Sequence, residues 1–174
     1  MTLSWYYMSR KKVMKKLRLY IDTSVLGGIF DTEDTQRVNT AETLLQSIKD
    51  GIYEGFISRL TIEEVFAAPD KIHETLQNKI SNASLNILEE TEESLSLAEA
   101  YLTDGAIPEK YRDDARHIAI GVVNELDYII SWNYKHMVNI AVRRRVNSTN
   151  IRMGYNLIEI ISPEEVIGGG DAEI

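Results

Sequence analysis

The stretch Leu19-Tyr20-Ile21-Asp22-Thr23-Ser24 decides the fold of this chain. Its apolar run ends in a carboxylate, and two hydroxyl side chains follow. This pattern is typical of a buried parallel strand that delivers an acid to its C-terminal end, where open α/β sheets bind ligands and metals. A second acidic centre follows at Asp113-Asp114-Ala115-Arg116-His117. Together the two centres predict a carboxylate metal site, and therefore phosphoryl chemistry.

The composition indicates one soluble globular domain. The chain has 174 residues, of which 44% are hydrophobic and 26% are charged, as in an ordinary single-core protein. No apolar run approaches the roughly 18 residues that would span a membrane. The chain has no cysteine, which excludes disulfides and thiolate metal sites and fits a cytoplasmic location.

The two ends of the chain are interpreted as extensions of a domain that covers residues 18–167. Residues 1–17 are basic and lack the apolar segment of a secretory signal. This extension is either disordered or the product of an over-extended start, because Met8 or Met14 would also begin a sensible chain. Residues 168–174 are expected to form a flexible tail.

The net charge of −8 argues against a broadly basic nucleic-acid binder but leaves a nuclease open. An acidic cluster that holds divalent cations lowers the net charge, and a local basic patch can still hold the substrate. Two candidate patches are residues 10–18 and Arg143–Arg145 with Arg152 nearby. The alternative interpretation of both patches is a solvated surface.

Strand and helix signals alternate along the sequence. We expect strands at residues 18–22, 55–58, 85–88, 128–131 and 157–161, and helices at 34–49, 61–68, 70–81, 91–102 and 109–126, with a last helical turn from 162. Such alternation predicts an α/β fold: a three-layer sandwich with a mostly parallel central sheet flanked by helices.

Helical periodicity sorts one pair of neighbouring acids and leaves another open. Asp114 borders the apolar stripe of the helix 109–126, whereas Asp113 groups with His117 and Asn124 toward solvent. The periodicity does not separate Glu63 from Glu64. The alternative roles are an N-cap or turn acid for Asp22, a surface acid paired with Arg116 or Lys110 for Asp114, and a solvated helix acid for Glu64.

The chain resembles the PIN domain, and especially the toxin nucleases of type II toxin–antitoxin pairs, the VapC-like group. The matching segments are residues 19–26, 57–65, 111–121, 127–133 and 158–165. Each motif alone is weak, but the ordered set at these spacings is fairly specific. The resemblance covers residues 18–167.

The resemblance implies a metal-dependent endoribonuclease that acts as a toxin. The metal-binding acids of the family fall on Asp22, Glu64 and Asp114, and its short hydroxyl or amide residue after the first acid falls on Ser24. RNA as substrate, a homodimer and a small antitoxin protein as partner are also implied. An antitoxin would insert a basic side chain toward Asp22 and Asp114.

The sequence departs from the family at Asn133, where many members carry an aspartate. Asparagine keeps an oxygen acceptor but loses the charge, so the number of bound metals is open. Asp127 precedes the strand and lies at the wrong end to replace that aspartate. The alternative function is therefore a catalytically weakened PIN domain that binds RNA or a partner protein.

The chemistry of the acids supports the same kind of site. Carboxylates that are brought together repel one another, and a hard cation relieves this repulsion. Mg²⁺ or Mn²⁺ suits ligands that are all oxygen. The histidines His73, His117 and His136 show no metal-ligand spacing and are interpreted as surface or structural residues. Trp132 and Tyr134 are expected to pack in the core rather than stack on bases.

Other enzyme classes fit the sequence less well. A haloacid-dehalogenase phosphatase requires a second aspartate two residues after Asp22, where this chain has Ser24. The run Gly168–Gly170 stands in the tail and not before a helix, which is the position that a phosphate-binding loop needs. No arrangement of serine, histidine and aspartate stands out.

Overall fold

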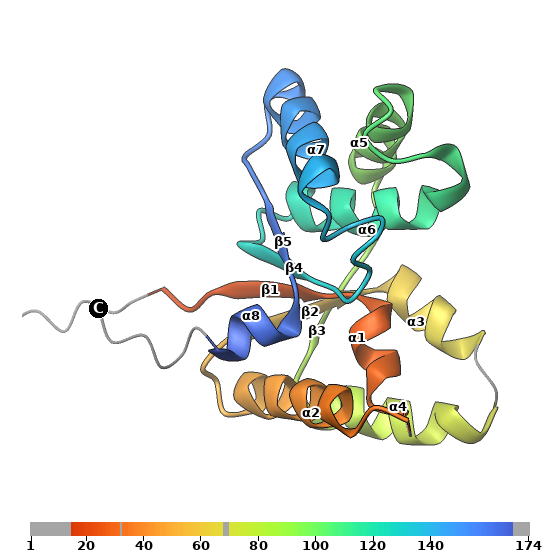
Figure 1. Ribbon diagram of the computed structural model, residues 1–174, viewed down its shortest axis with the longest axis vertical. Helices are drawn as coiled ribbons and strands as arrows, with labels where there is room; N and C mark the ends of the chain where they lie inside the picture. The colour runs from red at the N-terminus through yellow and green to blue at the C-terminus, as the bar shows by residue number, and fades with distance from the viewer. Residues whose placement is uncertain (1–14, 32, 68–69, 169–174) are drawn as a thin grey trace, which may run out of the picture.

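A five-stranded parallel sheet forms the centre of the molecule (Figure 1). The computed structural model describes residues 15–31, 33–67 and 70–168. The sheet order is β3-β2-β1-β4-β5, with β1 in the middle, and every pairing is parallel. The strands are β1 (Arg18–Ile21), β2 (Glu54–Ser58), β3 (Asn86–Leu88), β4 (Tyr128–Ile130) and β5 (Glu159–Ile161).

Helices cover both faces of this sheet and bury two separate apolar cores (Figure 1). One face carries α5 (Glu92–Thr103), α6 (Arg112–Val123) and α7 (Ile140–Met153), and η1 (Glu109–Tyr111) precedes α6. The other face carries α1 (Thr23–Gly28), α2 (Thr35–Lys49), α4 (Asp70–Asn82) and α8 (Pro163–Gly168). The helix α3 (Arg59–Phe66) contributes Leu60 to one core and Val65 to the other. The predicted three-layer α/β fold is confirmed.

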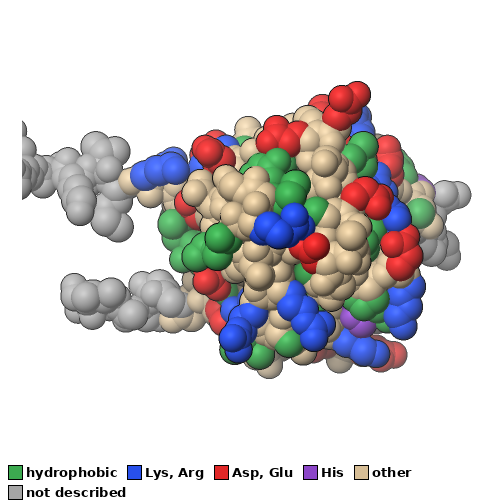
Figure 2. Space-filling view, turned by 90° about the horizontal axis from the view of Figure 1, so that it is seen from above, with side chains coloured by type: hydrophobic (Ala, Val, Ile, Leu, Met, Phe, Trp, Pro, Cys, Tyr) green, Lys and Arg blue, Asp and Glu red, His purple; other side chains and the backbone are tan. Residues whose placement is uncertain are grey.

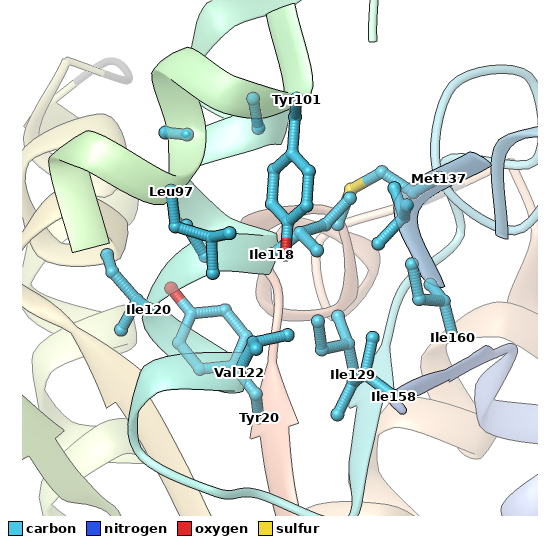
Figure 3. Close-up of a cluster of buried hydrophobic side chains, with 14 of the residues drawn as sticks. Tyr20, Leu97, Tyr101, Ile118, Ile120, Val122, Ile129, Met137, Ile158 and Ile160 are labelled. Atoms are coloured by element: carbon cyan, nitrogen blue, oxygen red, sulfur yellow. The ribbon is translucent and has the colours of Figure 1, made fainter. Parts of the chain in front are cut away.

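The central strand shows why the sequence forms this sheet. Side chains alternate between the faces of a strand, so Tyr20 enters the core under α6 while Leu19 and Ile21 enter the core under α1 and α2. Figure 3 shows Tyr20 and Ile129 in one apolar cluster with Ile118 and Ile120 of α6. Strands buried on both faces require continuous apolar runs, which explains the strong signal at this strand.

Two helices were missed by the sequence interpretation. α1 has only six residues and ends in Gly27 and Gly28. α7 carries four arginines and buries only Val146, Thr149 and Asn150, so it shows no broad apolar stripe. The helix predicted over residues 109–126 is observed as α6, which ends earlier, at Val123. The first three predicted residues form the separate turn η1.

The predicted extensions lie largely outside the described residues. Residues 1–14 and 169–174 are not described, and residues 15–17 precede β1. Within the described parts of the chain, no helix has the length and apolar character needed to cross a bilayer.

Candidate metal centre

Asp22 stands at the C-terminal end of the central strand β1. Asp22 is only 5% exposed, and its Oδ2 atom accepts hydrogen bonds from Ser24 Oγ at 2.6 Å and Ser131 Oγ at 2.9 Å. The backbone N–H of Ser24 also donates to Oδ2, which makes Asp22 the N-cap of α1. These donors fix one carboxylate oxygen, and Ser24 therefore serves to orient Asp22.

Glu64 enters the same region from α3. Glu64 is half-buried and Glu63 is exposed, so the structure places Glu64 at the site. Its Oε2 atom accepts a hydrogen bond from the hydroxyl of Thr23, the residue that follows Asp22. The same oxygen accepts a second hydrogen bond from His117 Nε2 at 3.0 Å.

His117 belongs to the site, although its helical position groups it with Asp113 toward solvent. It is only 1% exposed, so the prediction of a solvent-facing side chain is wrong, while a structural role fits. Its Nε2 lies 3.0 Å from Glu64 Oε2 and 3.9 Å from Asp22 Oδ1, and its Nδ1 lies 2.6 Å from the hydroxyl of Tyr20. α6 is buried over most of its circumference, so the narrow apolar stripe in its sequence underestimates the buried face.

The charges of Glu64 and His117 support each other. Burial opposes the ionisation of both groups. For Glu64 the hydrogen bond and positive charge of His117, the hydrogen bond from Thr23 and the charge of Arg116 together outweigh this cost and lower the pKa of the carboxyl. For His117 the hydrogen bond to Glu64 and the charges of Asp22, Glu64 and Asp114 raise the pKa of the imidazole. A carboxylate beside a protonated imidazole is therefore favoured in the free protein.

Asp114 approaches from the first turn of α6. Burial, followed by the negative charge of Asp22, raises the pKa of Asp114 from 3.8 to about 6. The charge of Glu64 acts in the same direction. The neighbouring Asp113 is exposed and pairs with Arg116 at 2.7 Å, so the predicted division between the two acids is correct.

Asn133 holds Asp114 through its amide nitrogen. Its Nδ2 donates to Asp114 Oδ2 at 3.0 Å, while its Oδ1 accepts from the backbone N–H of His136 at 3.1 Å. The amide oxygen is therefore used within the loop after β4. Asp127 accepts a hydrogen bond from the backbone N–H of Arg18, at the end of the strands that is opposite to the acidic site. This is the end at which the sequence places it.

The three acids fit a hard divalent cation by their donor atoms. In each carboxylate one oxygen is held by protein donors, and the second oxygen, Asp22 Oδ1, Glu64 Oε1 or Asp114 Oδ1, accepts no hydrogen bond from the described residues. Mg²⁺ and Mn²⁺ prefer such ligands. Among these residues, however, no three acidic or histidine side chains already surround one point as ligands, so cation binding requires side-chain adjustment.

The aromatic residues after β4 differ in their burial. Trp132 is buried, as expected, and its indole N–H donates to Glu164 at 2.8 Å. Tyr134 is 55% exposed, so the expectation that it packs in the core is wrong. The alternation of buried and exposed residues along a strand gives no prediction for Tyr134, because this residue lies beyond the end of β4.

The arginines of α7 fit a solvated surface. Arg143 pairs with Glu159 at 3.6 Å and Arg152 pairs with Asp104 at 2.6 Å. Figure 2, which looks down on α5 and α7 from above, shows basic side chains interspersed with acidic ones on this face. In the other candidate patch, residues 10–14 lie outside the described chain.

Two solved structures share the architecture of this chain. One is a toxin–antitoxin complex from Klebsiella pneumoniae, with a TM-score of 0.53, 19% sequence identity, and coverage of 71% of this chain and 93% of that chain. The other is VapBC2 from Rickettsia felis bound to a DNA fragment from their promoter, with a TM-score of 0.51, 11% identity, and coverage of 84% of this chain and 98% of that chain. The chain has a PIN-like fold. No protein-family model matches the sequence, and no curated protein matches it.

Proposed function

We propose that this protein is a metal-dependent endoribonuclease of the PIN type and the toxin of a type II toxin–antitoxin pair. The observation that supports the proposal is that Asp22, Glu64 and Asp114 are close enough for their charges to act on one another near the C-terminal end of a parallel sheet. In each of them one carboxylate oxygen accepts no hydrogen bond from the described residues. Ligands bind at this end of open α/β sheets, and three neighbouring carboxylates favour a cation.

The surrounding residues set the positions of these acids. Ser24 and Ser131 orient Asp22, and Thr23 and His117 orient Glu64. Asn133 orients Asp114. Mg²⁺ or Mn²⁺ bound to the acids would lower the pKa of a bound water and offset charge that develops on the phosphate. No side chain has to act as a covalent nucleophile.

The cellular role is inferred from the two solved relatives in fold, which are toxin–antitoxin complexes. By analogy the partner is a small antitoxin protein. We propose that it places an arginine or lysine toward Asp22 and Asp114, because such a cation can replace the charge of the metal. The homodimer stays a prediction, and light scattering at micromolar concentration tests it.

One observation favours a second candidate, a binding module without strong catalysis. Asn133 directs a donor, not an oxygen, toward Asp114, so this position supplies no additional charge for a second ion. A PIN-like domain with a weakened metal site could still bind RNA or a partner protein.

Cleavage of a labelled single-stranded RNA with and without Mn²⁺ separates the two candidates. We expect cleavage that needs the metal and is lost in Asp22→Asn, whereas Asp113→Asn, which changes an exposed acid, keeps it. Cleavage that persists in excess chelator would contradict the metal mechanism. RNA binding without cleavage in Mn²⁺ or Mg²⁺ would favour the binding module.

A further inference from the structure

Two lysines and two stacked rings lie together beside the acidic site. The rings of Tyr111 and His136 stack with their centroids 3.5 Å apart and an angle of 25° between their planes. Lys110 Nζ lies 4.8 Å from the centre of the Tyr111 ring. Lys135 directly precedes His136 in the loop after β4. We call Lys110, Tyr111, Lys135 and His136 the lysine–ring cluster.

This cluster is joined to Asp114 by short connections. Tyr111 is the residue before α6, and Asp114 lies in the first turn of that helix. From the other side, the backbone N–H of His136 donates to Asn133 Oδ1, and Asn133 Nδ2 donates to Asp114 Oδ2. The stacked rings therefore hold the start of α6 against the loop after β4, next to the acids.

The charges of the two lysines are available to a ligand. Both side chains are exposed, and neither has a carboxylate within ion-pair distance among the residues that the structure describes. The nearby Arg112 and Arg116, by contrast, each pair with two acids. Burial and the positive charges of Lys135 and Lys110 lower the pKa of His136, so its ring is neutral at neutral pH and the lysines supply the charge.

A nuclease with a net charge of −8 needs a local group of unpaired positive charges to hold its RNA substrate. The acids of the site repel the phosphates of RNA, and exposed cations next to them offset this repulsion over the range set by the Debye length of about 8 Å at physiological salt. Contacts from lysine to phosphate position a nucleic acid and carry no sequence information.

We propose that Lys110 and Lys135 each bind one phosphate of the RNA backbone next to the scissile bond, and that the Tyr111–His136 stack fixes the two lysines beside Asp114. This inference rests on the proposed function. It deepens that function by naming the part of the substrate that is held, which is the phosphate backbone and not the bases.

The test is the salt dependence of RNA cleavage by the charge-removing double variant Lys110→Gln/Lys135→Gln. The matched control is Lys16→Gln/Lys49→Gln, which removes the same charge from two exposed lysines at the opposite end of the strands, before β1 and at the end of α2. A labelled single-stranded RNA is cleaved in Mn²⁺ at several KCl concentrations between 50 and 200 mM, and kcat and KM are determined.

We expect the Lys110/Lys135 variant to raise KM several-fold and to leave kcat within about twofold. Because each phosphate contact contributes about 0.7 to the slope of log affinity against log salt on single strands, the slope of kcat/KM should become shallower by about 1.4. The control should follow the wild type. If both double variants behave alike, the inference is wrong while the proposed function stands. If the wild-type protein cleaves no RNA under any of these conditions, the proposed function fails and this inference fails with it.

Discussion

Asp114→Asn should stabilise the metal-free protein at neutral pH. Asp114 is partly buried beside Asp22 and Glu64, which raises its pKa to about 6. Asparagine removes the unfavourable charge. It keeps an oxygen that can accept the hydrogen bond from Asn133 Nδ2, so the geometry of the site is retained.

The size of the effect follows from the pKa of Asp114. The rise from 3.8 to about 6 corresponds to about 3 kcal/mol at 1.36 kcal/mol per pH unit, and partial exposure reduces this to roughly 1–2 kcal/mol. A carboxyl with a raised folded-state pKa stabilises the fold below its unfolded pKa, and this contribution is lost as the pH rises through the folded pKa. Asp114 therefore destabilises the wild type progressively between about pH 4 and pH 6 and fully above pH 7.

Thermal unfolding in EDTA at pH 4.5 and pH 8 measures this contribution. At about 2–4 °C per kcal/mol for a domain of this size, Asp114→Asn should raise the melting temperature by roughly 2–8 °C at pH 8 and by much less at pH 4.5. The control Asp113→Asn removes an exposed acid of the same helix turn and should change stability by less than about 1 kcal/mol at either pH.

Two outcomes would refute this reasoning. If Asp114→Asn is no more stable than wild type at pH 8, the carboxylates do not repel one another as the structure indicates. If the gain is the same at both pH values, it does not come from the charge of Asp114.

Gly28→Ala should destabilise the protein by about 1–3 kcal/mol, as overpacking does, because a Cβ at this position would lie 2.2 Å from Trp132 Cζ3. Gly27→Ala, whose Cβ would meet nothing within 4 Å, is the control, and equal denaturant midpoints for the two variants would contradict the packing. Asn133→Asp should lower the melting temperature of the metal-free protein, because it replaces a donor to Asp114 with a second carboxylate. Titration calorimetry should show tighter Mn²⁺ binding for this variant, and unchanged affinity would place residue 133 outside the influence of the metal.

The sheet and two of the acids were predictable because their signals are local. The run Leu19–Ile21 is apolar, as a strand buried on both faces requires, and Asp22 marks its end. The division between Asp113 and Asp114 followed from the period of a single helix. The choice of Glu64 over Glu63 as the third acid depended on the family resemblance, because helical periodicity did not separate the two residues.

The role of His117 was not predictable in the same way. Its burial depends on Tyr20 and Glu64, which meet it only in the folded chain. A histidine three residues after a site acid, on a helix whose following residues are almost all apolar, is the signal that could have suggested it. The orientation of the Asn133 amide was also hidden, because the backbone N–H of His136 sets it.

A crystal structure with Mn²⁺, located by its anomalous scattering, tests the central claim most directly. We predict an ion at the C-terminal end of β1, bound by the carboxylate oxygens of Asp22 and Asp114 with Glu64 in its coordination shell, and absent from crystals of Asp22→Asn grown in the same solution. An anomalous peak only elsewhere on the protein, or one at this position that persists in Asp22→Asn, would contradict the claim that these acids form a metal site.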